Sequence, residues 1–220
     1  MTAFREYEKW AFTATGGDDA PVFPDGCRDV LVIETRAGPP RIVLTDHDLV
    51  PRQVQLIAGT HITGYRLRPG SQLDPGALDA IARQPGDAET ILTASLRDPD
   101  DLGDAILALT RPGASLGSVA AAAGVSERTL QRRFREFDLP APDYWRLLAR
   151  ARRAAQSFAS ACTLADIAGE NGYADQAHIT RECLRWFGAT PARLRGDPRR
   201  LGLISQPALG NWTAEQISTR

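Results

Sequence analysis

Two stretches of this chain share one pattern, in which a small residue is followed four positions later by glycine. Ala120 and Gly124 form the pattern in the first stretch, and Ala168 and Gly172 form it in the second. A small residue lets a second helix pack closely against the first, and glycine allows the left-handed backbone of a tight turn. Each stretch therefore predicts a helix-turn-helix motif.

The residues after each glycine predict a capped, polar second helix. Ser126 and Asp175 are expected to be the N-caps of these helices. Leu130 and Phe134 are expected to form the buried face of the first one. The early residues of the later helix are polar: Gln176, His178, Thr180 and Arg181. A helix that enters the major groove of DNA needs such residues near its N-terminal end.

The two motifs form a repeat of nearly constant spacing. Ala120 and Ala168 are 48 positions apart, whereas Leu130 and Ile179 are 49 apart, so the second copy gains one residue after its glycine. Between the copies, residues 140–161 have apolar side chains at helical spacing, which predicts one long connecting helix. Two recognition helices held by such a connector can enter successive major grooves, about 34 Å apart.

The later stretch resembles the second helix-turn-helix of the AraC/XylS-type transcription regulators. The residues that match the family pattern are Ile167, Ala168, Gly172, Tyr173, Asp175, Gln176, His178, Arg181, Phe187, Gly188, Thr190, Pro191 and Arg195. The stretch departs from the pattern at Ile179 and Cys183, where Phe is usual, and at Leu184, where Lys is usual. The resemblance implies a sequence-specific DNA-binding regulator that contains two such motifs.

Side chains on both recognition helices are candidates for DNA contacts at positions that match the base-reading positions of the family. Arg can read guanine and Gln can read adenine through two hydrogen bonds, and Ala177 can contact a thymine methyl. The expected base-contacting residues are Arg128, Gln131, Arg132, Gln176, Ala177, His178 and Arg181. The expected phosphate-contacting residues are Arg133, Arg135, Arg185 and Arg193. Arg150 is expected to form a structural ion pair, and Trp186 and Phe187 to lie in the core.

The rest of the chain predicts an α+β fold with a small antiparallel β domain before the helical domain. Residues 1–70 contain short β-branched runs broken by turns, and a bulge is expected near Gly64. Residues 71–112 read as a linker of short helices, and 113–196 as the DNA-binding domain. Residues 197–220 are expected to be an irregular tail anchored by Trp212.

The β domain also resembles, more loosely, the N-terminal cupin-like sensor found in some AraC-type regulators. The segment 23–27, Gly59 and the segment 66–70 carry this resemblance, which implies a possible small-molecule effector. Trp10 and Phe12 are expected to fill the β core, with ligand stacking as an alternative for Trp10. Five residues could line a pocket mouth or lie on a plain surface: Arg28, Asp29, His61, Tyr65 and Arg66. His47 and His61 lack the paired spacing of a metal site, so no metal or cofactor is expected.

Charge and composition favour a DNA-binding protein over an enzyme. Residues 1–112 have a net charge of −6 and residues 113–196 a net charge of +4, which suggests that one part meets a polyanion. We find no phosphate-binding glycine loop and no sequence motif of a hydrolase, so an enzyme is not expected. Three scattered cysteines, no apolar run of eighteen residues and no signal core predict a cytoplasmic protein without a membrane segment.

Double-stranded DNA is the expected partner, with a homodimer and RNA polymerase as possible protein partners. The alternative is a ligand-sensing or partner-binding protein whose DNA-binding unit is weakened, as Cys183 and Leu184 would suggest. Substituting Arg132 and Arg181 separates these readings, because only the DNA-binding protein would lose affinity for DNA.

Overall fold

The computed structural model describes residues 6–16, 19–97 and 102–210. These residues form two compact units. The sheet unit comprises residues 6–16, 19–20, 27–47, 53–97 and 102–104, and the helical unit comprises residues 21–26, 48–52 and 105–210. Two short segments from the N-terminal region therefore belong to the helical unit. The sequence predicted no such exchange, because turns inside a β-rich stretch carry no signal of distant partners.

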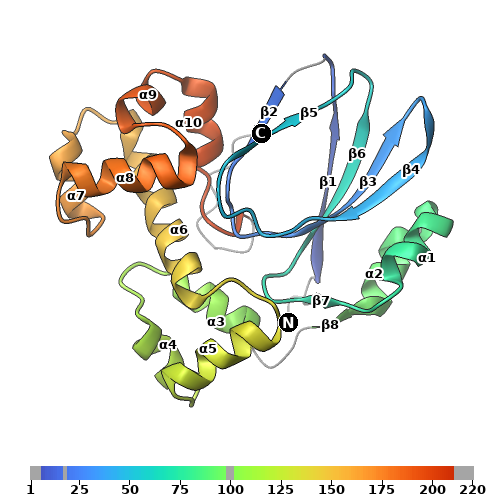
Figure 1. Ribbon diagram of the computed structural model, residues 1–220, viewed down its shortest axis with the longest axis horizontal. Helices are drawn as coiled ribbons and strands as arrows, with labels where there is room; N and C mark the ends of the chain where they lie inside the picture. The colour runs from blue at the N-terminus through green and yellow to red at the C-terminus, as the bar shows by residue number, and fades with distance from the viewer. Residues whose placement is uncertain (1–5, 17–18, 98–101, 211–220) are drawn as a thin grey trace, which may run out of the picture. The chain divides into compact units, whose positions relative to one another are not determined.

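The sheet unit is built on four antiparallel strands in the order β1-β6-β3-β4 (Figure 1). These strands are β1 (Tyr7–Thr13), β3 (Asp29–Thr35), β4 (Gly38–Leu44) and β6 (His61–Leu67). The register places Val30 opposite Tyr65 on one side and opposite Leu44 on the other. The remaining strands pair in twos, β2 (Asp19–Val22) with β5 (Arg52–Gln55) and β7 (Gln72–Leu73) with β8 (Leu96–Arg97).

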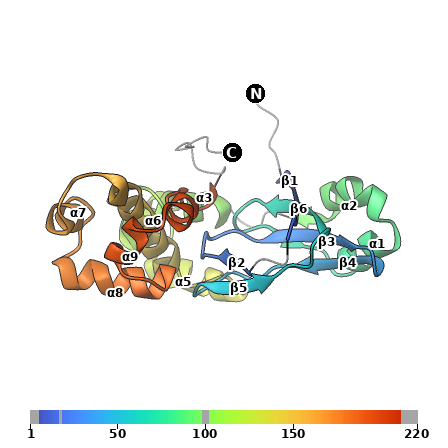
Figure 2. The same ribbon diagram turned by 90° about the horizontal axis from the view of Figure 1, so that it is seen from above.

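Two helices cover one face of this sheet and close its core. They are α1 (Ala77–Arg83) and α2 (Ala88–Ser95), joined by the 3-10 turn η1 (Pro85–Asp87), and α1 lies beside β4 (Figure 2). Side chains alternate across a strand, so every second residue of β3 and β6 faces the helices. The buried cluster that results consists of Val30, Val32, Tyr65, Leu67, Ile81, Ala88, Leu92 and Leu96.

Two expectations for the sheet were wrong: the bulge near Gly64 and the burial of Phe12 in the β core. The strand β6 pairs without interruption at Gly64, and the irregular register lies between β3 and β4, near Ile33 and Thr35. Gly64 is required for another reason, since a Cβ there would overlap the indole of Trp10. Trp10 is half-buried, and Phe12 is 47% exposed, so Phe12 does not fill the β core.

The helical unit contains the predicted pair of helix-turn-helix motifs and the long helix between them. Its helices are α3 (Leu102–Leu109, whose first turn belongs to the sheet unit), α4 (Leu116–Ala122), α5 (Glu127–Glu136), α6 (Pro142–Gln156), the 3-10 turn η2 (Ser157–Ala159), α7 (Leu164–Glu170), α8 (Gln176–Phe187), α9 (Pro191–Arg195) and α10 (Pro198–Ile204). The helix α6 runs from α4 and α5 at one end to α7 and α8 at the other (Figure 1). It lies within the predicted connector, residues 140–161, but ends earlier, at Gln156, where η2 follows.

The core of the helical unit surrounds α6 and the C-terminal end of α8. Its largest fully buried side chains include Trp145, Phe158, Trp186 and Phe187. Trp186 and Phe187 are therefore core residues, as expected. The tail prediction was wrong at α10, where Asp197 caps a regular helix, and Trp212 lies outside the described residues. Among the described helices, none has the length and apolar character needed to span a bilayer.

Candidate nucleic-acid interface

The first helix-turn-helix motif is formed by α4 and α5. Ser115 and Ser118 form a capping box at the start of α4, with 3.0 Å from the Ser118 amide nitrogen to the Ser115 Oγ. Ala120 is 2% exposed where the two helices pack, and Gly124 turns the chain with φ of 68°. Ser126 then caps α5 by accepting the Thr129 amide at 3.1 Å. The predicted small residue, turn glycine and cap are confirmed.

The second motif, formed by α7 and α8, repeats this construction. A capping box starts α7, Ala168 is 1% exposed, and Gly172 has φ of 70°. After the turn, the Tyr173 amide donates to the Ala168 carbonyl at 2.8 Å. Asp175 caps α8 by accepting the His178 amide at 2.7 Å. The same local interactions therefore set the start of both recognition helices.

The outward face of α5 carries the basic and amide side chains predicted to contact bases. Arg128, Gln131 and Arg132 are all exposed, opposite the buried Leu130 and Phe134. Arg132 forms an ion pair with Glu136, with 2.8 Å from Nη1 to Oε1. Both side chains of this pair are about half exposed or more, so the pair is weakly held and can open when another anion approaches.

The outward face of α8 is less charged. Gln176, Ala177 and Arg181 are exposed at helical spacing, and Leu184 continues the same face with 48% exposure. His178 is half-buried against the turn: its ring meets Tyr173 edge-on at 5.2 Å.

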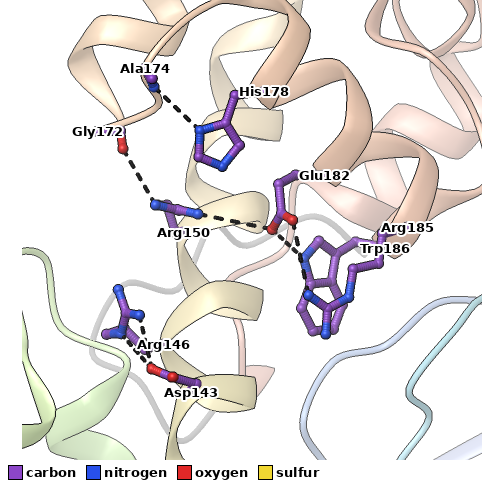
Figure 3. A network of polar contacts seen from close by, with 9 residues as sticks. All are labelled: Asp143, Arg146, Arg150, Gly172, Ala174, His178, Glu182, Arg185 and Trp186. Carbon is purple, nitrogen blue, oxygen red and sulfur yellow. Dashed lines mark hydrogen bonds and ion pairs between the residues drawn. The ribbon is translucent and has the colours of Figure 1, made fainter.

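The His178 Nδ1 accepts the amide of Ala174 at 3.4 Å, so a neutral ring carries its proton on Nε2 (Figure 3). The turn therefore fixes which nitrogen of His178 can donate a hydrogen bond.

The arginines expected at phosphates differ in how firmly they are held. Arg135 and Arg193 are exposed, whereas Arg133 is half-buried. Arg185 is 51% exposed, with its guanidinium 4.6 Å from the centre of the Trp186 ring and 4.0 Å from a Glu182 oxygen. These contacts orient Arg185 along the surface of α8.

A polar network joins α6 to the second motif, as expected for Arg150 (Figure 3). Arg150 donates from Nη1 to the Gly172 carbonyl at 3.3 Å, and its guanidinium lies 4.3 Å from the centre of the Tyr173 ring. Its Nη2 is 3.9 Å from a Glu182 oxygen that also accepts the Trp186 indole N–H at 3.0 Å. Burial raises the pKa of the Tyr173 hydroxyl, which stays neutral beside Arg150. Arg150 therefore fixes the turn of the second motif.

Sequence reasoning missed a second arginine of α6. Arg152 is 3% exposed and donates to the carbonyl of Pro24 at 2.8 Å. A signal was present in the sequence, because Arg152 falls between Leu148 and Ala155 on the apolar stripe of α6. A charged residue on such a stripe must find buried partners.

The five residues that could line a pocket mouth lie at different places in the sheet unit. Asp29 and Arg66 lie on the face of Trp10, where Asp29 Oδ1 accepts the Trp10 indole N–H at 2.8 Å and lies 3.4 Å from Arg66 Nε. Tyr65 lies on the opposite face, in the core beneath α1 and α2. The His61 Nδ1 is hydrogen-bonded to the Thr13 Oγ1 at 2.9 Å. Arg28 Nε donates to the Thr45 carbonyl at 3.2 Å.

Within the part of the chain that the structure describes, no three His, Cys, Asp or Glu residues are grouped as metal ligands would be. Two capped recognition helices, each preceded by a left-handed glycine and joined through one long helix, define a class of protein. This class is the DNA-binding protein with a double helix-turn-helix.

A match to a family model agrees with the helix-turn-helix part of this class. Residues 119–197 match a family model described as a helix-turn-helix domain. A solved structure of ToxT from Vibrio cholerae is similar with a TM-score of 0.42 and 8% sequence identity, over 87% of this chain and 98% of that chain. No curated protein matches the sequence. Residues 119–197 therefore carry a helix-turn-helix domain, in agreement with the two motifs described above.

Proposed function

We propose that the protein is a sequence-specific regulator that reads two successive major-groove segments of one DNA site with α5 and α8. The duplicated motif carries this proposal, because both helices begin at a side-chain cap after a turn glycine. The connector α6 has 15 residues and is about 22 Å long. This length is of the same order as the spacing of about 34 Å between successive major grooves.

Both recognition helices would contribute base contacts. On α5, Arg128, Gln131 and Arg132 would read guanine and adenine edges, supported by their exposure on one face. On α8, Gln176 and Arg181 would do the same, Ala177 would contact a thymine methyl, and His178 would donate from Nε2. The phosphate contacts would come from Arg133, Arg135, Arg185 and Arg193.

The sheet unit would bind a small-molecule effector. The face of its sheet opposite α1 and α2 places an aromatic ring, Trp10, beside a cation, Arg66, and a carboxylate, Asp29. A homodimer and contact with RNA polymerase are the protein interactions that such a cytoplasmic regulator would use. We assign it no enzymatic activity, metal or cofactor.

Selection of bound fragments from pooled genomic DNA, at two salt concentrations, tests the proposal. We expect a bipartite motif whose halves are about one helical turn apart. Arg128→Ala should weaken base preference in one half, and Arg181→Ala should weaken it in the other. The matched control is Arg199→Ala, which removes an exposed arginine of α10 that lies outside both recognition helices.

Two outcomes would contradict the proposal. Binding that falls steeply with salt but selects no motif would indicate a nonspecific binder. Absence of binding at both salt concentrations would favour the ligand-sensing or partner-binding alternative, for which the exposed Leu184 on α8 is the supporting observation.

A further inference from the structure

The C-terminal end of α8 is packed against two segments that come from the N-terminal region of the chain. We call residues 21–26 the first strap and residues 48–52 the second strap. Both straps belong to the helical unit rather than to the sheet unit.

Arg152 anchors the first strap. Its Nε donates to the Pro24 carbonyl at 2.8 Å, and its Nη2 lies 3.5 Å from the Phe23 carbonyl oxygen. Its Nη1 donates to the carbonyls of Leu203 and Gln206 at 3.3 and 3.0 Å. Arg152 is buried, so its guanidinium needs its N–H groups satisfied, and main-chain carbonyls from two distant parts of the chain do so here. Arg152 therefore joins the first strap to α6, to the last turn of α10 and to the segment that follows it.

The side chains of the first strap reach the recognition helix. The ring of Phe23 meets the ring of Phe187, the last residue of α8, edge-on at 6.4 Å. The Leu209 amide donates to the Asp25 carbonyl at 2.7 Å. A Cβ at Gly26 would lie 2.9 Å from the Leu209 side chain and 3.3 Å from Trp145. The first strap is therefore a closely packed part of the helical unit.

The second strap reaches the same end of α8 by a different route. The hydroxyl of Tyr144, on α6, donates to the Asp48 carbonyl at 2.9 Å. The ring of Tyr144 also packs against Trp186 of α8 at 5.6 Å. Pro51 lies so close to Gly188, the C-cap of α8, that a Cβ on Gly188 would be 3.2 Å from the Pro51 Cγ. Both straps thus converge on the last turn of α8.

The two straps continue into neighbouring ends of one β-hairpin. The first strap precedes β3, and the second follows β4. The Thr45 amide donates to the Asp29 carbonyl at 2.9 Å, and the Asp29 amide donates to the Thr45 Oγ1 at 2.8 Å. Since Asp29 and Thr45 are bonded to each other, the chain segments that lead to the two straps leave the hairpin at the same end.

Resting on the proposed function, we infer that the two straps position α8 for reading DNA, with Arg152 and Tyr144 as positioning residues. The straps contact the C-terminal end of α8, whereas Gln176 and Arg181 lie toward the other end. A helix of 12 residues is about 18 Å long, so a tilt of about 5° at the held end moves the far end by about 1.5 Å. Such a shift is large enough to break a two-bond contact with a base.

The test uses the full chain and DNA duplexes obtained from the selection experiment with the wild type. Each duplex is altered in only one half of the bipartite motif. Tyr144→Phe removes the hydroxyl donor but keeps the ring on Trp186. Arg152→Lys keeps the charge but cannot reach all the carbonyls. The matched control is Arg153→Lys, one position further along α6, because Arg153 Nη1 donates to the Thr110 carbonyl.

We expect Tyr144→Phe and Arg152→Lys each to lose about fivefold or more of the discrimination between bases in one half of the DNA motif. This is the half that Arg181→Ala also affects. Discrimination in the half that Arg128→Ala affects should stay within about twofold, and Arg153→Lys should leave both halves unchanged. Loss in both halves alike, or in neither, would overturn the inference. Tyr144→Phe keeps the test valid if Arg152→Lys does not fold.

A second measurement needs no DNA. Amide hydrogen exchange in the last turn of α8 should be faster in Tyr144→Phe than in the wild type, with exchange in α5 unchanged. Unchanged exchange at Phe187 and Gly188 would overturn the inference even if the wild type binds DNA. If the wild type selects no motif, the proposed function fails, and the exchange result still decides whether the straps hold α8.

Discussion

At the scale of single residues, the turn glycines of the two motifs are equivalent. Gly124 and Gly172 have φ of 68° and 70°, and a Cβ at either would meet nothing within 4 Å. Alanine at either position should therefore cost only backbone strain, about 1–2 kcal/mol of unfolding free energy. Gly26→Ala should cost more, since its φ is 80° and a Cβ would also press on Leu209.

Urea unfolding of the three full-length variants measures these costs. The comparison between Gly26→Ala and the two turn variants is its own control, because all three replace a glycine of positive φ. A smaller loss at Gly26 than at Gly124 would contradict the packing of the first strap.

The cysteines differ in their predicted reactivity. Burial raises the pKa of the Cys183 thiol to about 12, so it stays protonated and unreactive at pH 8. Cys27 is also buried, whereas Cys162 is exposed. An alkylating reagent at pH 8 should modify Cys162 in the native protein, and the other two only after unfolding. Mass spectrometry of digested samples checks this, and rapid native modification of Cys183 would contradict it.

At the scale of elements, we expect the ion pair on α5 to oppose the proposed DNA binding. Glu136 pairs with Arg132 and adds a negative charge to the face that would meet DNA. Glu136→Gln should therefore bind the selected duplex about threefold more tightly at low salt, with a smaller gain as salt rises. Fluorescence anisotropy measures the affinity. Asp79→Asn on α1 makes the same change of charge in the sheet unit and should have no effect.

The helices of the helical unit could be predicted because their signals are local. A cap residue, an apolar stripe and a turn glycine each act within a few positions of the chain. The same rules would have found α10, since Asp197 caps it and Pro198 occupies its first position. That helix was missed because two flanking Gly and Pro breaks outweighed these signals.

The faces of α5 and α8 could also be predicted from the repeat, but the partners of their side chains could not. The orientation of His178 depends on Tyr173 and Ala174, which the turn brings beside it. The burial of Arg152 depends on carbonyls 128 positions earlier in the chain. Periodicity reports which side of a helix is buried and carries no information about which distant segment covers it.

At the scale of the whole molecule, the contacts of the straps indicate that the core of the helical unit is incomplete without residues from the N-terminal region. A fragment of residues 102–220 would expose the surface of Phe187 and Trp145 that the first strap covers. We expect this fragment to unfold at a lower temperature than the full chain and to bind a hydrophobic dye. Circular dichroism and dye fluorescence check both effects. A fragment as stable as the full chain would contradict the prediction.

The burial of Arg152 against Pro24 also has a consequence for synthesis on the ribosome. The two residues are 128 positions apart, so at about 5–20 residues per second the first strap leaves the ribosome roughly 6–25 s before its partner. The four main strands end at Leu67 and can pair within that interval. The strap still awaits Leu209, almost the last described residue. A nascent chain can therefore complete the packing around the end of the second recognition helix only after residue 209 has been synthesised.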